Sequence, residues 1–505
     1  MNTPLRRVAV AVMVMVVALL ANATYVQVFK ADDYRNDPRN TRVLLDEYSR
    51  QRGQISAGGT VLASSVETED RYKYLRTYPT DPQAYAPVTG YYTMQNGSGG
   101  LERFEDPLLN GSDSQLFGRR LIDLVSGRDP RGGNVLTTLN PVMQQVAYEQ
   151  LTAKGYTGSV VAIEPSTGKI LTMVSTPSYD PNVLAGHDAA ETTEALEALN
   201  SDPDKPMLNR AISQTYPPGS TFKVVVTAAA LANGVATPED QFTAAPNITL
   251  PGTATTLENY NGSSCGPGPT ASLTDAFRLS CNTAFVELGQ RVGAAALKDT
   301  AAAFGVGPHN GIPMPVAEST VGAGPGHPAR GPASHGPRGG AGAPPAPPPP
   351  PPPPPAAPRT PLDNAVIAAT IANGGVRMEP YLVDQRQGPD LSELSKTKPV
   401  SVGQAVSAQV ASQLTGMMIA SEANTVGGNR AGYTIASKTG TAEHGTDPRN
   451  TPPHAWYIAF APAQNPKIAI AVIVEDGGDR ALAATGGSVA APIARAVLDA
   501  GLQGG

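Results

Sequence analysis

The 505-residue chain has little of what marks several common classes of protein. It contains only two cysteines, Cys265 and Cys281, which excludes a cysteine-rich zinc or iron–sulfur site. Its six histidines are scattered without metal-ligand spacing, so neither a metal nor another cofactor is expected. Charged residues make up 16% of the chain, the formal net charge is −6 and there is no basic block, so no nucleic-acid partner is indicated.

Long apolar runs are also missing, with one exception at the N-terminus. Arg6 and Arg7 precede an apolar stretch over residues 8–29, and a membrane-spanning helix needs about 20 residues. The small residues at 21–23 leave a cleaved signal peptide open as the competing interpretation. Because the stretch is longer than a signal-peptide core of about 7–15 residues, we expect a single-pass anchor in the cell membrane. The arginine pair should then stay cytoplasmic, and everything after residue 30 is expected outside the cytoplasm.

Local patterns predict two folded parts after this anchor, which occupies residues 1–30. Residues 31–150 are polar and turn-rich with short strand-like pieces, so we expect a smaller, β-rich, non-catalytic domain there. Residues 151–505 open with a hairpin pattern and close with a strand and a helix, which predicts an α+β domain. The individual elements predicted are a helix at 141–156, a hairpin of 160–163 with 170–174, a strand at 467–475 and a helix at 486–502.

The most informative stretch is TYPPGSTFKVVVTAAALANG at 215–234. Two prolines exclude a helix before Gly219, and an apolar helix is predicted directly after it. Ser220 then lies at the helix start, where free N–H groups favour developing negative charge. Lys223 lies on the same face, and burial would lower its pKa until it can take a proton from the serine. The alternative is an N-cap serine followed by a lysine with a buried stem.

Two further motifs follow in the chain. They are Ser280-Cys281-Asn282 and Lys438-Thr439-Gly440-Thr441. S-x-x-K, S-x-N and K-T-G in this order are the signatures of the penicillin-binding proteins and serine β-lactamases, which the chain resembles. The stretch at 158–182 and the sequence PPHAWYIAFAP after KTGTAEHG resemble penicillin-binding transpeptidases in particular. QRGQISAGGTVLAS at 51–64 resembles the stretch that opens the N-terminal dimerisation-type region of class B enzymes.

This resemblance implies a fold and an activity. The fold is the α+β fold of the serine β-lactamases and penicillin-binding transpeptidases, a central antiparallel sheet with helices, here with a smaller N-terminal β-rich domain and a single transmembrane helix. The activity is that of a membrane-anchored peptidoglycan D,D-transpeptidase. In this family Ser220 would attack a stem-peptide carbonyl with Lys223 as the base, and a second stem's amine would resolve the acyl-enzyme into a cross-link. Ser280 would relay a proton to the leaving amine, and Asn282 would orient Lys223.

The resemblance also assigns the K-T-G motif and the partners. Lys438 would supply positive charge near the substrate carboxylate, and Thr439, Gly440 and Thr441 would bind the substrate. The N–H groups of Ser220 and Thr441 would form the oxyanion hole. The partners implied are peptidoglycan stem peptides, β-lactam antibiotics as covalent inhibitors, the membrane, and a membrane-embedded lipid-linked glycan polymerase. A D,D-carboxypeptidase and a catalytically impaired penicillin-binding scaffold are the alternative functions.

Several side chains near the motifs have expected roles of their own. Tyr216, Phe222 and Trp456 are expected to pack in the core, whereas it is open whether His444 and His454 line the cleft. For the cysteines, which lie 16 positions apart, a disulfide is expected outside the cytoplasm, with two buried thiols as the alternative. Such a bridge would hold the S-x-N loop in place.

The segment at 323–359 departs from the composition of the rest. Residues 321–360 hold 16 of the 49 prolines, nine of them consecutive at 347–355, and no acidic residue. A proline run can join neither a sheet interior nor a helix. Because family-like sequence stops near residue 322 and resumes at residue 360, two hypotheses stand. The segment is either a true insertion inside the catalytic domain or the product of a translated reading-frame slip.

Overall fold

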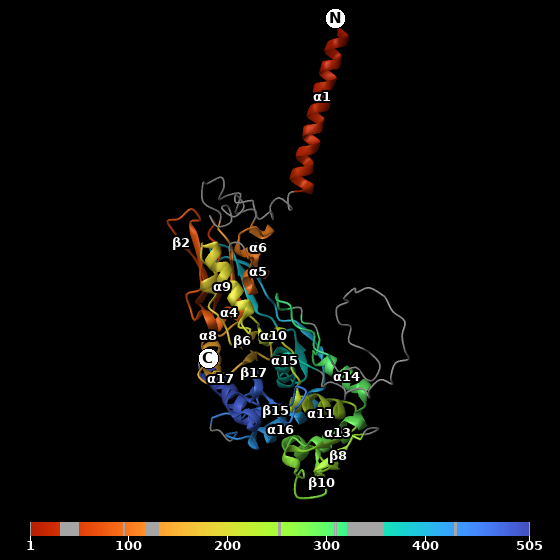
Figure 1. Cartoon of the computed structure of the whole chain (residues 1–505). Coiled ribbons are helices and arrows are strands. Elements are labelled where there is room, and N and C mark those ends of the chain that lie inside the picture. Colours follow the sequence, from red (N-terminus) through yellow and green to blue (C-terminus); the bar gives the residue numbers. More distant parts are fainter. Residues whose placement is uncertain are drawn as a thin grey trace, which may run out of the picture.

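The structure is a computed structural model that describes residues 2–30, 50–93, 96–116, 131–250, 254–307, 309, 311–320, 358–428 and 432–503. Figure 1 shows an elongated body in which the N-terminal strands and the helices around the three sequence motifs lie at opposite ends. The proline run at 347–355 lies outside the described residues.

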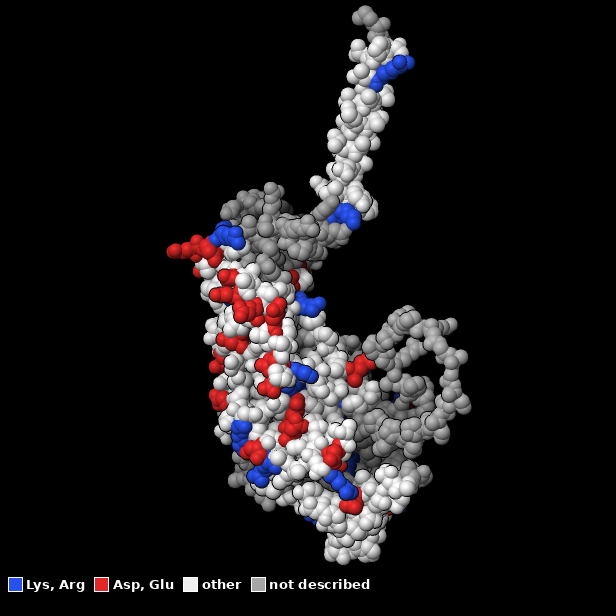
Figure 2. Space-filling model, viewed as in Figure 1, with Lys and Arg blue, Asp and Glu red and all other residues white. Residues whose placement is uncertain are grey.

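The N-terminal apolar stretch forms one long helix. It consists of α1 (Asn2–Thr24) and a π-helical turn η1 (Tyr25–Phe29). Within residues 3–29, an 18-residue window has a mean hydropathy of 2.2, and none of that window is buried against the protein. Figure 2 shows the helix as an uncharged rod with basic side chains only near its ends. Its length and composition are those of a membrane span.

The centre of the larger part is a five-stranded antiparallel sheet in the order β15-β16-β17-β5-β6. Every residue of its middle strand β17 is buried, as expected for a strand covered on both faces. The predicted hairpin and the predicted C-terminal strand are both confirmed. The strands are β5 (Gly158–Ile163), β6 (Ile170–Thr176), β15 (Ala436–Ala442), β16 (His454–Ala461) and β17 (Ile468–Val474).

Helices cover both faces of this sheet, and alternate strand residues divide between them. Ile470 and Val472 pack with α8 and α17, whereas Ala469 and Ala471 face the core shared with α11, α15 and α16. The helices are α8 (Pro141–Thr152), α11 (Lys223–Ala232), α15 (Pro361–Ala372), α16 (Ala408–Ala423) and α17 (Ala491–Gln503). The predicted helix after Asn140 is confirmed, since the Asn140 side chain caps it by accepting from the N–H groups of Val142 and Met143.

The second sheet has six strands in the order β13-β12-β4-β1-β2-β3. Its members are β1 (Ile55–Ala57), β2 (Thr60–Glu67), β3 (Tyr74–Thr77), β4 (Asn134–Thr137), β12 (Val383–Gln387) and β13 (Glu393–Lys396). Strand β12 pairs antiparallel with β4, so residues 383–396 complete a sheet that begins before residue 60. A linear division of the chain at residue 150 therefore cuts through this sheet.

Shorter elements fill the space between the sheets and around the motifs. Those before the Ser220 turn are α4 (Pro82–Thr89), α5 (Gly100–Phe104), α6 (Asp106–Leu109), η2 (Ser114–Leu116), η3 (Pro181–Leu184), α9 (Ala189–Ser201) and α10 (Arg210–Ser213). Around the motifs they are η4 (Gly219–Phe222), β7 (Gln241–Thr243), β8 (Asn247–Thr249), β9 (Thr256–Glu258), η5 (Tyr260–Gly262), β10 (Thr270–Ser272), α12 (Leu273–Arg278), α13 (Asn282–Val292) and α14 (Ala294–Ala303). The remaining ones are β11 (Val376–Met378), β14 (Ser401–Gln404), η6 (Glu475–Ala483) and η7 (Gly486–Ala490).

The described residues on either side of the proline-rich segment lie next to each other. The Thr320 N–H donates to the Pro358 carbonyl at 3.4 Å, and the backbone of Arg359 pairs with that of Tyr216. Ser319 and Thr360 both bind the buried Asp363 carboxylate. Residues 320 and 358 thus lie at one place in the folded domain, beside the stretch that leads to Ser220.

Candidate active site

Ser220 lies on a turn that packs against the K-T-G strand. It belongs to the 3₁₀ turn η4, and the α-helix begins only at Lys223, three residues later than the sequence pattern predicted. Gly219 has φ of 52° and a Cβ there would lie 2.6 Å from the Thr441 carbonyl oxygen, so only glycine fits this close approach. The turn therefore holds Ser220 against the edge of β15.

Lys223 is buried and points at the S-x-N motif. It is 8% exposed, and its Nζ donates to the Ser280 carbonyl at 2.5 Å and to Asn282 Oδ1 at 2.7 Å. A third contact joins Nζ to Ser280 Oγ at 3.2 Å. The Phe285 ring lies 5.4 Å from the same ammonium. Among the described residues, the hydrogen-bond partners of this nitrogen thus come from the short connection between α12 and α13 and from the first residue of α13.

The S-x-N residues occupy a tight connection between two helices. Ser280 has φ of 62°, a left-handed conformation that is uncommon for serine and persists only where the surroundings hold it. The Cys281 N–H donates to the Ala276 carbonyl at 2.9 Å, and Asn282 starts α13. The Asn282 amide donates to the Glu258 carbonyl at 2.8 Å, which directs its oxygen toward Lys223.

Lys438 approaches the same serine from the opposite side. It is fully buried on β15, and its Nζ donates to Ser280 Oγ at 2.9 Å and to the Thr439 carbonyl at 3.1 Å. The Ser280 hydroxyl therefore lies between two lysine side chains from different motifs. This is the feature on which the chemistry of the site depends.

Burial lowers the pKa of both lysines. Burial lowers the pKa of Lys438 to about 7, and burial together with the charge of Lys438 lowers the pKa of Lys223 well below its ordinary value. Within the described ranges neither ammonium forms an ion pair with a carboxylate. A lowered pKa favours the neutral amine of Lys223, which is the form able to accept a proton, as a nucleophile's general base must.

The other K-T-G residues line the edge of the sheet. Because β15 is an edge strand, one row of its backbone groups has no strand partner. Thr439 and Thr441 are half-buried there. A Cβ on Gly440 would lie 3.0 Å from both Thr221 and Trp456, so a larger residue would push the nucleophile turn away.

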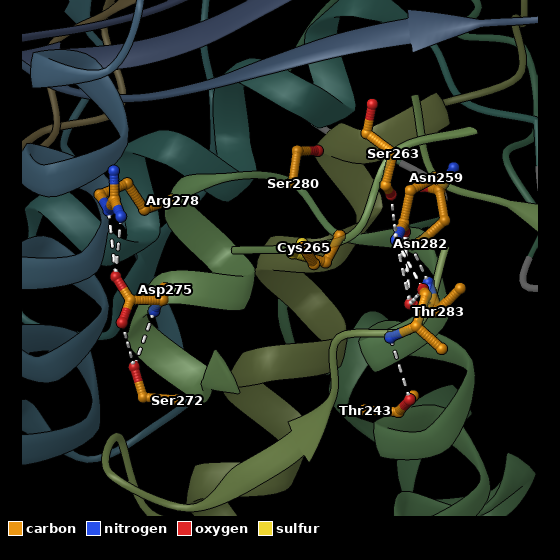
Figure 3. Close-up of a disulfide and its surroundings, with 12 residues drawn as sticks. Thr243, Asn259, Ser263, Cys265, Ser272, Asp275, Arg278, Ser280, Asn282 and Thr283 are labelled. Carbon is orange, nitrogen blue, oxygen red and sulfur yellow. Dashed lines mark hydrogen bonds and ion pairs between the residues drawn. A yellow bond between two sulfur atoms is a disulfide. The ribbon is translucent and has the colours of Figure 1, made fainter. Parts of the chain in front are cut away.

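Cys265 and Cys281 form a disulfide beside the S-x-N residues (Figure 3). Their Cα atoms are 5.8 Å apart and both residues are buried. The bridge ties the connection before α13 to the loop that follows β9. Asn259 ties the same two segments together, since its side chain binds Thr283 and the Ser263 carbonyl.

Some residues that support the site give no signal in the sequence. Glu422 on α16 is 2% exposed and accepts hydrogen bonds from Tyr457 at 2.7 Å and Arg495 at 2.9 Å. It also accepts from Ser437, the residue before the motif lysine. A single glutamate in an amphipathic helix is usually a solvated surface residue, so only the packing identifies it.

The aromatic neighbours of the turn are packing residues, as expected, and Phe222 packs against the margin of the main core. Tyr216 and Trp456 are buried, and the Trp456 Nε1–H donates to the Pro217 carbonyl at 3.0 Å. Phe222 is half-buried. These contacts fix the backbone on the N-terminal side of Ser220.

Two histidines and an acid come together near the end of β15. His444, His454 and Asp476 offer three ligand atoms within 4.8 Å of one another. The imidazole rings are stacked, however, with centroids 3.8 Å apart and 7° between planes. His454 Nδ1 accepts from the Asp476 N–H at 3.2 Å. Parallel rings cannot both aim a lone pair at one ion, so this arrangement does not fit a metal.

Comparison with known proteins agrees with this geometry. The family described as "Penicillin binding protein transpeptidase domain" matches residues 158–324 and 358–499, leaving out 325–357. "Penicillin binding protein A dimerisation domain" matches residues 52–135. The peptidoglycan D,D-transpeptidase PbpA of Mycolicibacterium smegmatis is 60% identical over 100% of both chains. The PbpA of Mycobacterium tuberculosis is 57% identical, again over 100% of both.

A solved structure resembles the fold over most of its length. It is a ceftriaxone acyl-enzyme complex of penicillin-binding protein A from M. tuberculosis, which is 55% identical and superimposes with a TM-score of 0.83. The alignment covers 91% of this chain and 100% of that one. The side chains of the S-x-x-K and K-T-G motifs meet at Ser280 of the third motif. Together with the matched family model and these relatives, this geometry shows that the chain belongs to the penicillin-binding protein transpeptidase family.

Proposed function

We propose that this protein is a peptidoglycan D,D-transpeptidase that works through an acyl-serine intermediate on Ser220. The observation that carries the proposal is the pair of buried lysines that meet at the Ser280 hydroxyl, one of which, Lys223, directly follows the turn that holds Ser220. The relatives named peptidoglycan D,D-transpeptidase and the acyl-enzyme structures with β-lactams support it. β-Lactams are accordingly expected to acylate Ser220.

The acylation step follows from the protonation of the site. Neutral Lys223 takes the proton of the Ser220 hydroxyl as Oγ attacks the carbonyl carbon of the penultimate D-alanine. The N–H groups of Ser220 and Thr441 stabilise the oxyanion, and one such donor is typically worth about 3–4 kcal/mol. When the C–N bond breaks, the proton passes from Lys223 through Ser280 to the departing D-alanine. The Lys223–Ser280 contact supplies the path for this transfer.

The second half-reaction reverses the proton path. The amine of a neighbouring stem peptide attacks the ester carbonyl and loses a proton through Ser280 and Lys223, and Ser220 leaves as the free hydroxyl. Lys438, with Thr439, Gly440 and Thr441 on the edge strand, holds the terminal carboxylate of the donor. Asn282 keeps the Lys223 nitrogen in place through its 2.7 Å contact.

The proposed cellular setting follows from the N-terminal helix. Residues 1–30 anchor the protein by one span, with Arg6 and Arg7 cytoplasmic and the catalytic residues outside. Residues 31–150 form the non-catalytic region, completed by the strands at 383–396, and residues 151–505 form the transpeptidase domain. A membrane-embedded, lipid-linked glycan polymerase is the proposed partner, because cross-linking needs newly made glycan strands beside the anchor.

Covalent labelling tests the proposal directly. Wild-type protein and Ser220→Ala are incubated with a fluorescent penicillin and separated in denaturing gels. The exposed Ser213, on the short helix α10 before the turn, provides the matched control Ser213→Ala. Label on wild type and Ser213→Ala but not on Ser220→Ala is expected. An unlabelled wild type would contradict the proposed enzyme and would favour a scaffold without activity.

Product analysis separates the transpeptidase from the carboxypeptidase. A stem peptide ending in D-Ala-D-Ala is supplied with an acceptor amine, and the products are identified by mass. A cross-linked product supports the transpeptidase, whereas release of D-alanine with water as the sole acceptor identifies a carboxypeptidase.

A further inference from the structure

Arg359 is a fully buried charged residue beside the nucleophile turn. Its exposed fraction is 0%, and its backbone N–H and carbonyl each pair with Tyr216 at 2.9 Å. The guanidinium carbon lies 4.2 Å from the centroid of the Phe222 ring. Because Phe222 and Ser220 share the turn η4, whatever displaces the Phe222 ring acts on the nucleophile.

Among the residues that the structure describes, no carboxylate forms an ion pair with the guanidinium. Within the described part of the chain, none of its three nitrogens has a hydrogen-bond partner. The Asp363 carboxylate acts on it only at a distance, since that group binds His309 at 2.9 Å, Thr360 at 2.6 Å and Ser319. Residues 321–360 contain no acidic residue, so the adjoining chain supplies no carboxylate either.

The charge remains despite its burial. Burial lowers the pKa of Arg359 only to about 10, so the group is protonated at neutral pH. A buried charge without hydrogen bonds is costly, and an apolar side chain of similar volume is often better tolerated in its place.

A second buried arginine near Tyr216 has the partners that a buried guanidinium ordinarily has, a carboxylate and a backbone carbonyl. Arg210 is 4% exposed, and its Nε donates to Glu475 at 2.9 Å, while a second nitrogen donates to the Asp204 carbonyl at 2.8 Å. The Tyr216 hydroxyl donates to the same carboxylate at 2.6 Å. Two arginines thus flank one tyrosine, one of them paired and the other not.

We propose that Arg359 is a positioning residue that weakens this enzyme, because its buried charge, which has no hydrogen-bond partner among the described residues, destabilises the Phe222–Ser220 turn. The kinetic consequence rests on the proposed function, and the consequence for stability does not. Residue 359 is also the last residue of the segment expected at 323–359, and the family match resumes at 358.

The test compares three variants of the full-length protein. Arg359→Leu removes the charge, Arg359→Lys keeps it, and Arg210→Leu removes the paired charge as the matched control. The melting temperature is measured first, and then the acylation rate constant and the preceding binding constant are measured separately with a fluorescent penicillin. Arg359→Leu is expected to melt at least about 2 °C higher and to acylate about threefold faster or more at unchanged binding constant. Arg210→Leu should melt lower, and Arg359→Lys should resemble the wild type.

Each contrary outcome has its own meaning. A lower melting temperature for Arg359→Leu would show that the guanidinium has a stabilising partner and would overturn the proposal. A higher melting temperature with an unchanged rate constant would overturn the positioning role. If Arg359→Leu melts higher but neither it nor the wild type is labelled, the proposed function fails while the inference on stability stands.

Discussion

Two regions of this molecule bury a pair of cations, and they do so in opposite ways. In the six-stranded sheet region, Arg52 and Arg76 both bind the fully buried Glu102 at 2.6 Å. In the active site, Lys223 and Lys438 both bind the neutral Ser280 hydroxyl, at 3.2 and 2.9 Å. The first pair shares a carboxylate, and the second shares an uncharged group.

The difference shows how burial is used for stability in one place and for chemistry in the other. Burial alone would lower the pKa of Arg52 and raise that of Glu102, but their mutual attraction reverses both directions and keeps the groups charged. With no carboxylate among the described neighbours of the two lysines, burial lowers both pKa values unopposed. The arginines therefore hold a fold together, and the lysines are left able to exchange protons.

The largest effect on the acylation rate is expected when the active site, which holds the two lysines, loses its general base Lys223. Lys223→Met keeps the apolar stem but removes the amine, so Ser220 has no group to take its proton. Acylation by a fluorescent penicillin should slow by about 10²–10⁴-fold. Lys298→Met, at an exposed position on α14, is the control and should leave the rate unchanged. A rate within a few fold of wild type in Lys223→Met would remove the lysine from the mechanism.

Removing the carboxylate that Arg52 and Arg76 share should lower the stability of the protein without changing the acylation rate. Glu102→Gln leaves Arg52 and Arg76 buried without a counter-charge, which should lower the unfolding free energy by about 3–5 kcal/mol. Asp106→Asn removes only the half-exposed second partner of Arg52 and should cost much less. Denaturant unfolding measures both. If Glu102→Gln is as stable as the wild type, the shared carboxylate does not stabilise the fold and the proposed difference between the two regions is wrong.

A smaller effect is expected from the bridge beside the lysine pair. A closed loop of this length is worth roughly 3 kcal/mol in the unfolded-chain model. Reduction, or the double variant Cys265→Ala/Cys281→Ala, should lower the melting temperature and slow acylation by loosening Ser280 and Asn282. Wild-type protein that is unfolded, treated with the same reductant and then alkylated gives the reference for complete reduction. An acylation rate independent of the redox state would show that the helices alone hold the S-x-N residues.

Much of the site could be predicted because its chemistry is local in sequence. S-x-x-K, S-x-N and K-T-G each place their side chains by a turn, a helix start or a strand, and the structure brings Lys223, Ser280, Asn282 and Lys438 together. The hairpin of β5 and β6 and the strand β17 were equally predictable, since their apolar runs are bounded by turns.

The rest depends on contacts between distant residues. Strand β12 pairs with β4 across about 250 positions, and nothing in the polar sequence VDQRQ indicates its partner. The Glu258 carbonyl orients Asn282 through a backbone atom, which no residue type reveals. In the sequence, Arg359 belongs to a polar, proline-rich segment, and only its packing against Phe222 in the structure shows that it is buried.

The central claim is that Lys223 acts as a neutral base because Lys438 and burial lower its pKa. The most direct test is the pH dependence of acylation in wild type and in Lys438→Met, each normalised to its own maximum. The base must be unprotonated, so the rate should fall as the pH drops through its pKa, well below the ordinary lysine value. Removing the Lys438 charge raises that pKa, so the acid limb of Lys438→Met should move to higher pH. An acid limb that does not move, or a wild-type rate that still rises toward the ordinary lysine pKa, would contradict the account.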